Sequence, residues 1–383
     1  MSFQLTDEQE HFRKSVQDFV KSEILPYAEQ WDRQESTPRE IVKKLSDKGL
    51  LCPTIPKKYG GLELDQVRYG ILHEEIGRGC SSVRSLLTVH SSLTAETISR
   101  WGNEAQKQQW LPKLCKGEKV AAFGLSEPTT GSDAQNVQTT YTQVDGGYVL
   151  NGHKKWITFS QMADLFVIVA KGDQGVCAFL VESVTEGCTV NPLTGMLGTK
   201  ASMLGEIILE DCFVPEAHLL GRPGFGFAQI VNTALDNGRF SVACGSLGIA
   251  RACLEDSVAY AKERQQFGSP IKDHQLIKQK ITNMITEVKA ARLLCYNAAH
   301  LRATKNPDSF IQTTVAKYYT TQAANRIASE AVQLHGAAGC HDSRPIQRYF
   351  RDAKIMEIIE GSSEIQQILI ANQGLASLSS ILS

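Results

Sequence analysis

Apolar residues recur at helical spacing in the first third of the chain. An amphipathic helix is predicted by side chains three or four positions apart, namely Phe12, Val16, Phe19, Val20 and Ile24. Thr6 and Gln9 have the spacing of a capping box at its start. Thr37-Pro38 and Gly49 predict the two ends of a second helix. We therefore expect an N-terminal helical domain over residues 1–118.

The pattern changes between about residues 119 and 222, where short β-prone runs alternate with turn residues. The predicted strands are Val120–Leu125, Tyr148–Leu150, Trp156–Thr158, Leu165–Ala170, Cys177–Val181 and Glu206–Leu209. Asp145-Gly146-Gly147 and Asn151-Gly152 are typical hairpin signals. No helix-length segment separates consecutive strands, so the pattern favours an antiparallel sheet or barrel over a doubly wound parallel sheet.

Residues 223–383 return to helical spacing, with longer elements. Long helices are predicted over Gly226–Arg264, Asp273–Ala303 and Asp308–Leu334. Long helices joined by short loops indicate an antiparallel helix bundle. The fold class expected for the whole chain is therefore α+β, with a β domain between two helical domains.

Composition narrows the classes of function. The 383 residues carry 40 Lys and Arg against 41 Asp and Glu, so no basic excess points to nucleic acid or an anionic membrane. No apolar run reaches membrane-spanning length, and Met1–Glu8 shows no secretory or transit pattern, which favours a cytoplasmic protein. The ten cysteines are never closer than nine residues apart. They predict separate thiols in a reducing compartment and no metal site.

Several common nucleotide and hydrolase motifs are absent. Gly224-Phe225-Gly226 lacks the third glycine of a dinucleotide fingerprint, and no Walker A or GxSxG motif occurs. A cofactor, if present, is therefore held without a glycine-rich nucleotide loop.

Several ordered motifs carry a resemblance to a known family. They are Tyr59-Gly60-Gly61, His90-Ser91-Ser92, Ala122–Asp133, Lys155–Thr158, Glu263–Gly268, Gln333–Gly336, Arg351–Lys354 and Ile359–Gln366. With these motifs the chain resembles the acyl-CoA dehydrogenase family over essentially its whole length. The resemblance implies an FAD-dependent oxidoreductase.

The resemblance also implies which residues hold FAD. Ser126 would bond the pyrimidine edge of the flavin, Thr158 would lie near N5, and Trp156 would pack on the ring. Arg264 would bind the pyrophosphate, for which a guanidinium fork is suited. The other implied FAD contacts are Phe123, Leu125, Gly131, Ser132, Ile157, Phe267, Gln275, Gln333, Leu334, His335, Gly336, Ala337, Ser362 and Glu364. In the family the adenosine-side contacts come from a neighbouring subunit, which implies a homodimer or homotetramer.

Glu360 is the candidate catalytic base. A carboxylate before a helix can serve only as a favourable terminal charge, but in the family this position removes the α-proton of the acyl thioester. Ser363 and Gln366 have the spacing of a capping box for the helix that follows. Some relatives carry an alternative base one position before Arg239, where this chain has Gly238. The β-hydride would then pass to flavin N5. The implied substrate contacts are Ser132, Asp236, Arg239 and Gly361.

Two stretches depart from the common family pattern. Ile359-Glu360-Gly361-Ser362-Ser363 replaces the usual Tyr-Glu-Gly-Thr-Ser, and Val83–His90 is also unusual. Both resemble a biosynthetic branch that oxidises short polar acyl groups on an acyl carrier protein in polyketide or hybrid peptide pathways, including hydroxymalonyl and aminomalonyl routes. The alternatives are a short-chain acyl-CoA dehydrogenase of fatty- or amino-acid catabolism and a catalytically silent scaffold. The electron acceptor would be an electron-transfer flavoprotein or oxygen.

Overall fold

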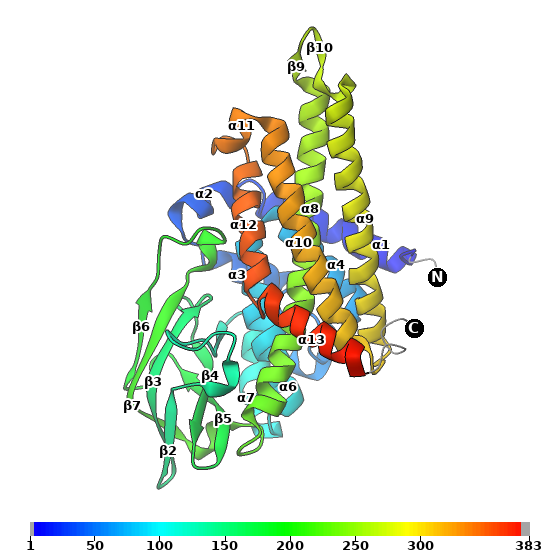
Figure 1. The fold of residues 1–383 in the computed structure, drawn as a ribbon. Helices are drawn as coiled ribbons and strands as arrows, with labels where there is room; N and C mark the ends of the chain where they lie inside the picture. The colour runs from blue at the N-terminus through cyan, green and yellow to red at the C-terminus, as the bar shows by residue number, and fades with distance from the viewer. Residues whose placement is uncertain (1–3, 377–383) are drawn as a thin grey trace.

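Three regions of distinct secondary structure follow one another in the computed structural model, which describes residues 4–376 (Figure 1). The start of the Met1–Glu8 stretch and the last seven residues of the predicted C-terminal domain lie outside the described residues. The N-terminal helices are α1 (Asp7–Glu23), α2 (Ala28–Gln34), α3 (Glu40–Asp47), α4 (Gln66–Gly79), α5 (Ser81–Leu87), a π-helical segment (Thr88–Ala95), α6 (Glu96–Trp101) and α7 (Glu104–Cys115).

Local signals fix the ends of the first helices. Gln9 donates its backbone N–H to the Thr6 hydroxyl, and Thr6 donates its own to the Gln9 side chain, so the predicted capping box is confirmed. Gly49, at φ 68°, follows the end of α3 as predicted. A positive φ there is a conformation that glycine adopts without steric cost.

The middle region is an eight-stranded sheet. Its strands are β1 (Ala121–Gly124), β2 (Thr140–Val144), β3 (Gly147–Ile157), β4 (Leu165–Gly172), β5 (Gly175–Glu182), β6 (Cys188–Pro192), β7 (Gly205–Pro215) and β8 (Leu219–Leu220). Their order is β6-β7-β3-β2-β4-β5-β8, with β1 paired to β4. Most pairs are antiparallel as predicted, but β4 pairs in parallel with both β1 and β2.

One of the two predicted hairpins is correct. Val144 pairs with Gly147 across the Asp145-Gly146 loop, which joins β2 to β3. The prediction at Asn151-Gly152 is wrong, because Gly152 lies inside β3 at a register shift. A Cβ on Gly152 would lie 2.5 Å from the Thr139 hydroxyl, so glycine serves a close approach of two backbones rather than a turn.

Long helices form the C-terminal region. A π-helical segment (Gly226–Val231) leads into α8 (Asn232–Glu263), and the β9–β10 hairpin (Gln265–Gln266 and Ser269–Pro270) follows. The remaining helices are α9 (Gln275–Ala303), α10 (Ser309–His335), α11 (Ala337–Cys340), α12 (Ile346–Ile358) and α13 (Ser363–Ala376). In Figure 1, α8, α9 and α10 run side by side, and the β9–β10 hairpin stands at the end of the molecule away from the sheet. No described helix combines the length and apolar character needed to cross a membrane.

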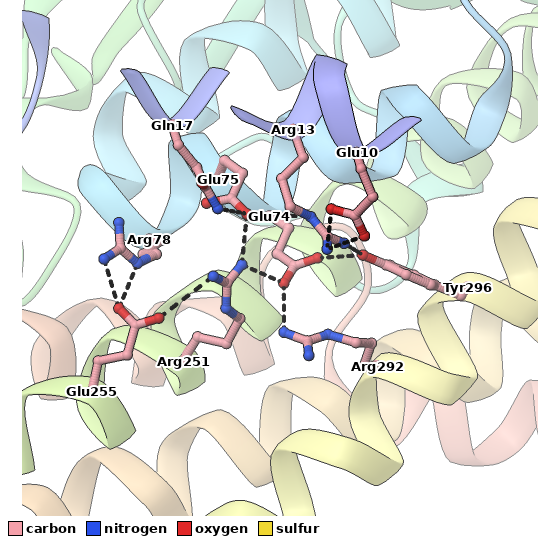
Figure 2. A network of polar contacts seen from close by, with 10 residues as sticks. All are labelled: Glu10, Arg13, Gln17, Glu74, Glu75, Arg78, Arg251, Glu255, Arg292 and Tyr296. Atoms are coloured by element: carbon pink, nitrogen blue, oxygen red, sulfur yellow. Dashed lines mark hydrogen bonds and ion pairs between the residues drawn. The ribbon is translucent and has the colours of Figure 1, made fainter. Parts of the chain in front are cut away.

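A buried ionic network joins the two helical regions (Figure 2). Glu74 on α4 is fully buried and accepts from Arg251 of α8 at 2.6 Å and from Arg292 of α9 at 3.1 Å. The Tyr296 hydroxyl donates to its other oxygen at 3.0 Å. Burial raises the pKa of Glu74, but the surrounding arginines outweigh it and leave that pKa lowered. The network therefore ties α4 to α8 and α9 of the C-terminal bundle.

Candidate active site

Glu360 lies in the short loop between α12 and α13. Ile359 caps α12 in an extended conformation, and Glu360 then adopts a left-handed backbone at φ 56°. Left-handed backbone in a non-glycine residue costs free energy and often marks a functional site. Gly361 follows at φ 90°, and the two residues together turn the chain into α13.

The Glu360 side chain reaches Gly238 on α8. A Cβ built on Gly238 would lie 2.2 Å from Glu360 Oε2, so a side chain at residue 238 would displace the carboxylate. Oε2 is buried and accepts no hydrogen bond from any residue in 4–376. Within the described chain the backbone N–H of Glu360 also has no acceptor. A carboxylate oxygen and an amide donor are thus both available at one residue.

Three cations surround the carboxylate without forming an ion pair with it. Burial raises the pKa of Glu360 to about 7, against the opposing effects of Arg84, Arg239 and Lys317. A carboxylate that titrates near neutrality is suited to general-base catalysis at physiological pH. Arg239, itself buried, donates Nε to the Glu360 carbonyl at 3.4 Å.

Arg84 on α5 is fully buried and forms no ion pair in the part of the chain that the structure describes. Its guanidinium donates to the Thr88 hydroxyl at 2.8 Å and to the weakly accepting Met356 sulfur at 3.1 Å, while Nε has no partner. Burial lowers the pKa of Arg84 to about 10, and Glu360 is the carboxylate that opposes this most. A buried guanidinium with an unused donor is costly unless something else satisfies it.

The predicted capping box before α13 is wrong. Ser363 is the first helical residue, and its hydroxyl is buried without a partner. Gln366 instead donates its side-chain amide to Gly361 O at 3.0 Å and to Glu360 O at 3.4 Å. Its side chain therefore holds the loop that carries Glu360. Ser362 and Glu364 stand at the same helix start, where the helix N-terminus and Ser362 lower the pKa of Glu364.

Asp236, a predicted substrate contact, is held by Arg302 of α9 through an ion pair of 2.5 Å. Its other oxygen, Oδ1, is buried and unpartnered. Arg302 also donates to Asn237, so its contacts tie α9 to α8 directly before Gly238 and Arg239.

The predicted flavin-ring residues surround a buried ion pair in the sheet. Lys154 Nζ is 2.6 Å from Glu127 and 3.2 Å from the Leu125 carbonyl, and both charged side chains are buried. Burial lowers the pKa of Lys154 to about 8. Lys155 donates its backbone N–H to the Ser126 carbonyl at 2.9 Å. The two predicted flavin stretches are therefore brought together.

Side chains from these stretches differ in exposure. Phe123, Leu125 and Ile157 are buried, whereas Ser126 and Thr158 are half-buried. Gly131 and Ser132 are exposed in the loop after β1. Trp156 is 49% exposed and sits at φ 65°, which turns its large ring out of the regular strand.

The predicted adenosine-side residues meet in one groove of about 760 Å³ at the far end of the bundle. Its lining includes Arg264, Phe267, Gln275, Gln333, Leu334, His335, Gly336 and Ala337. Phe267 is 96% exposed. Gly336 takes φ 60°, while Ala337 begins α11 without a positive φ, so alanine is tolerated where relatives have a second glycine.

The groove and the flavin-ring residues do not meet within one chain. β9, next to Arg264, and the sheet that carries Trp156 lie at opposite ends of the molecule (Figure 1). The structure thus places Glu360, Gly361 and Arg239 together, the sheet residues together, and the groove residues together, as three separate groups.

Two polar residues near the base were not singled out from the sequence. The motifs include Arg84 only within the unusual stretch Val83–His90, although it is the one charge in an otherwise uncharged run from Ser81 to Ala95. Lys317 lies outside every motif. A signal existed, because Thr313, Thr314, Thr320, Thr321 and Ala324 place small residues on its side of α10, so this lysine interrupts an inward-facing stripe.

The three regions of the fold correspond to the three domains of one enzyme family. Models of the acyl-CoA dehydrogenase N-terminal, middle and C-terminal domains match residues 6–118, 122–212 and 224–375. The chain belongs to the acyl-CoA dehydrogenase family. It is 39% identical over 381 residues to the mitochondrial short-chain specific acyl-CoA dehydrogenase of Rattus norvegicus, covering 98% of this chain and 92% of that protein.

Solved structures give the same result. Butyryl-CoA dehydrogenase from Megasphaera elsdenii superposes with a TM-score of 0.94 at 36% identity, covering 98% of this chain and 100% of the other. The prolyl acyl carrier protein oxidase AnaB has a TM-score of 0.92 at 30% identity, with coverage of 96% and 99%. FkbI, for biosynthesis of the methoxymalonyl extender unit of the Fk520 polyketide, has a TM-score of 0.87 at 32% identity, with coverage of 95% and 99%.

The chain is therefore an FAD-dependent oxidoreductase. Its residues fit that cofactor. Arg264 forms no side-chain ion pair in the described residues and lines the groove, so its guanidinium is free for phosphate oxygens. The half-exposed Trp156 offers an aromatic face among the predicted flavin-ring residues of the sheet.

Proposed function

We propose that this chain oxidises a short acyl thioester whose acyl group carries an anionic or strongly polar substituent, and that an acyl carrier protein presents this substrate. The observation that carries the proposal is Arg84, a buried and incompletely satisfied guanidinium whose charge acts on Glu360. A carboxylate on the acyl group would satisfy it bidentately. A purely aliphatic acyl chain would leave it unpaired, which is a strong basis for discrimination.

In this proposal Glu360 takes the α-proton of the thioester. Its unpartnered Oε2 can accept that proton, and its free backbone N–H can donate to the thioester carbonyl, where negative charge develops. Arg239 and Gln366 hold the loop in place through its carbonyl oxygens. FAD, when bound, supplies the hydride acceptor. An electron-transfer flavoprotein or oxygen would take up the electrons afterwards.

The carrier protein is favoured by the neighbours AnaB and FkbI, one an acyl carrier protein oxidase and the other acting in an extender-unit route. Ile359, where the family usually has tyrosine, removes a hydroxyl and an aromatic wall beside the thioester. The second candidate is a short-chain acyl-CoA dehydrogenase, which the 39% identity to the rat enzyme favours.

The experiment measures flavin reduction by four thioesters. Pentanoyl and glutaryl groups have the same length and differ by a methyl against a carboxylate, and each is loaded on coenzyme A and on an acyl carrier protein. We expect a higher kcat/KM for glutaryl than for pentanoyl and for the carrier protein than for coenzyme A. The carrier advantage should shrink as salt is raised, because local basic residues steer an acidic partner.

Arg84→Met and Arg84→Lys test whether Arg84 binds the anionic group of the substrate. Arg84→Met should lower kcat/KM for glutaryl thioesters at least about 30-fold, because a buried charge pair loses one partner, and should affect pentanoyl thioesters much less. Arg84→Lys should recover part of the loss. Equal losses for both acyl groups would refute the anion site. Equal or better turnover of the coenzyme A esters would return the chain to ordinary acyl-CoA oxidation.

A further inference from the structure

Lys317 on α10 is fully buried and holds the loop of the base from both sides. Its Nζ donates to Gly361 O at 2.7 Å and to Glu357 O at 3.2 Å. Glu357 lies in the last turn of α12, where carbonyl oxygens lack helical partners, and Gly361 directly follows the base. The ammonium therefore fixes the backbone before and after Glu360.

That placement matters because the Glu360 backbone is left-handed at φ 56°. Such a conformation persists only where the surroundings over-determine it. Three donors reach the carbonyl oxygens of this loop: Arg239, Gln366 and Lys317. Lys317 is the donor that also binds the end of α12, so it sets the loop relative to that helix.

Charge gives Lys317 a second effect on the same residue. The third N–H of its ammonium has no acceptor in the described residues, and Glu360 is the carboxylate that interacts with it most strongly. Arg239, Glu357 and Glu364 are the other charged groups that act on it. Burial lowers the pKa of Lys317 to about 7 and raises that of Glu360 to about 7, so the two groups titrate in the same range.

We propose that Lys317 is a positioning residue for the base: its hydrogen bonds hold the Glu360 loop across α12 and Gly361, and its charge favours the ionised form of the Glu360 carboxylate before substrate enters. The inference rests on the proposed role of Glu360 as the base. Arg84 on α5 and Arg239 on α8 also face the carboxylate and remain in place when Lys317 is changed.

Two variants separate charge from hydrogen bonding. Lys317→Met removes both the ammonium and its hydrogen bonds. Gln366→Met is the matched control, since it removes a neutral donor to the same Gly361 carbonyl and leaves every charge. Both should slow flavin reduction by a short acyl thioester. Only Lys317→Met should raise the pKa of Glu360, by about one unit, because it removes a nearby opposite charge.

The pKa of Glu360 is measured in two ways on the full chain with FAD bound. One is the acidic limb of the pH profile for flavin reduction, and the other is the protonated-carboxyl infrared band without substrate, assigned by its loss in Glu360→Gln. We expect the wild-type and Gln366→Met values to agree and the Lys317→Met value to be higher. A Lys317→Met value equal to the wild-type value would overturn the proposal.

A second pair covers the case in which Lys317→Met does not fold. Lys317→Arg keeps the charge, so the pKa of Glu360 should stay at its wild-type value. Lys317→Gln removes the charge, so the pKa of Glu360 should rise. Equal pKa values in the two would contradict the proposal. Failure of the base itself has a different signature: Glu360→Gln would then reduce flavin at a near-normal rate.

Discussion

Burial raises the pKa of Glu360 to about 7 because its effect outweighs that of three surrounding cations. Two predictions concern this residue. Flavin reduction by substrate should rise with pH through about 7, since only the ionised carboxylate accepts a proton. Glu360→Gln keeps the shape and removes the basic oxygen, so reduction should fall about 10²–10⁴-fold while FAD stays bound. Stopped-flow absorbance of the flavin measures both effects.

The control for this prediction is Glu210→Gln, an exposed carboxylate on β7 far along the chain from the base. It should reduce at the wild-type rate. Rapid reduction in Glu360→Gln would mean that another group takes the proton.

Sequence motifs predict a role for Glu360 but do not predict its surroundings. The motif places a carboxylate before a helix, whereas its burial depends on Gly238, which lies 122 positions earlier and leaves space for Oε2. Arg84 and Lys317 reach the same point from α5 and α10, and long-range packing of this kind leaves no local pattern. The capping box was mispredicted because spacing alone cannot show that Gln366 bonds the Glu360 loop instead.

At the scale of elements, the ionic network of Figure 2 ties α4 to α8 and α9. Glu74→Gln leaves Arg251 and Arg292 without this partner in a buried site. The free energy of unfolding should therefore fall by about 3–5 kcal/mol. Glu255→Gln, at the half-exposed edge of the same network, should lower the free energy of unfolding by less than about 1 kcal/mol. Urea unfolding at neutral pH measures both.

The stability lost in Glu74→Gln should depend on pH. The folded-state pKa of Glu74 is lowered, so its stabilisation is present above the unfolded value of about 4.5 and is lost as pH falls through the lower folded value. The difference between wild type and Glu74→Gln should therefore shrink in acid. A difference that stays constant down to low pH would show that folding does not lower the pKa of Glu74, and a difference that grows in acid would show that folding raises it.

Element boundaries followed from sequence wherever a local signal determines them. Helix α9 begins two residues after the predicted Asp273, and α10 ends one residue after Leu334, because turn residues and helical spacing mark these ends. Two features needed tertiary information. The parallel pairing of β1 with β4 and the register shift at Gly152 depend on which strands meet, and strand propensity does not encode that.

At the scale of the whole molecule, the predicted FAD contacts lie at two ends of one chain (Figure 1). We infer that one FAD site combines the groove of one subunit with the flavin-ring residues and base of another. In a two-fold dimer each subunit would then contribute to both sites. Arg264→Ala should weaken FAD binding, because the phosphate loses its guanidinium, and should leave the fold intact, because Arg264 is exposed.

Mixing two inactive variants tests this arrangement directly. Arg264→Ala damages the groove and Glu360→Gln damages the base, so neither homodimer should work at limiting FAD. In a mixed dimer with shared sites, one site carries both defects and the other carries neither. Random subunit exchange should therefore restore about a quarter of the sites, since half of the dimers are mixed and each has one intact site. If each chain builds its own site, every site keeps one defect, and the exchanged mixture will show no more activity than the separate variants.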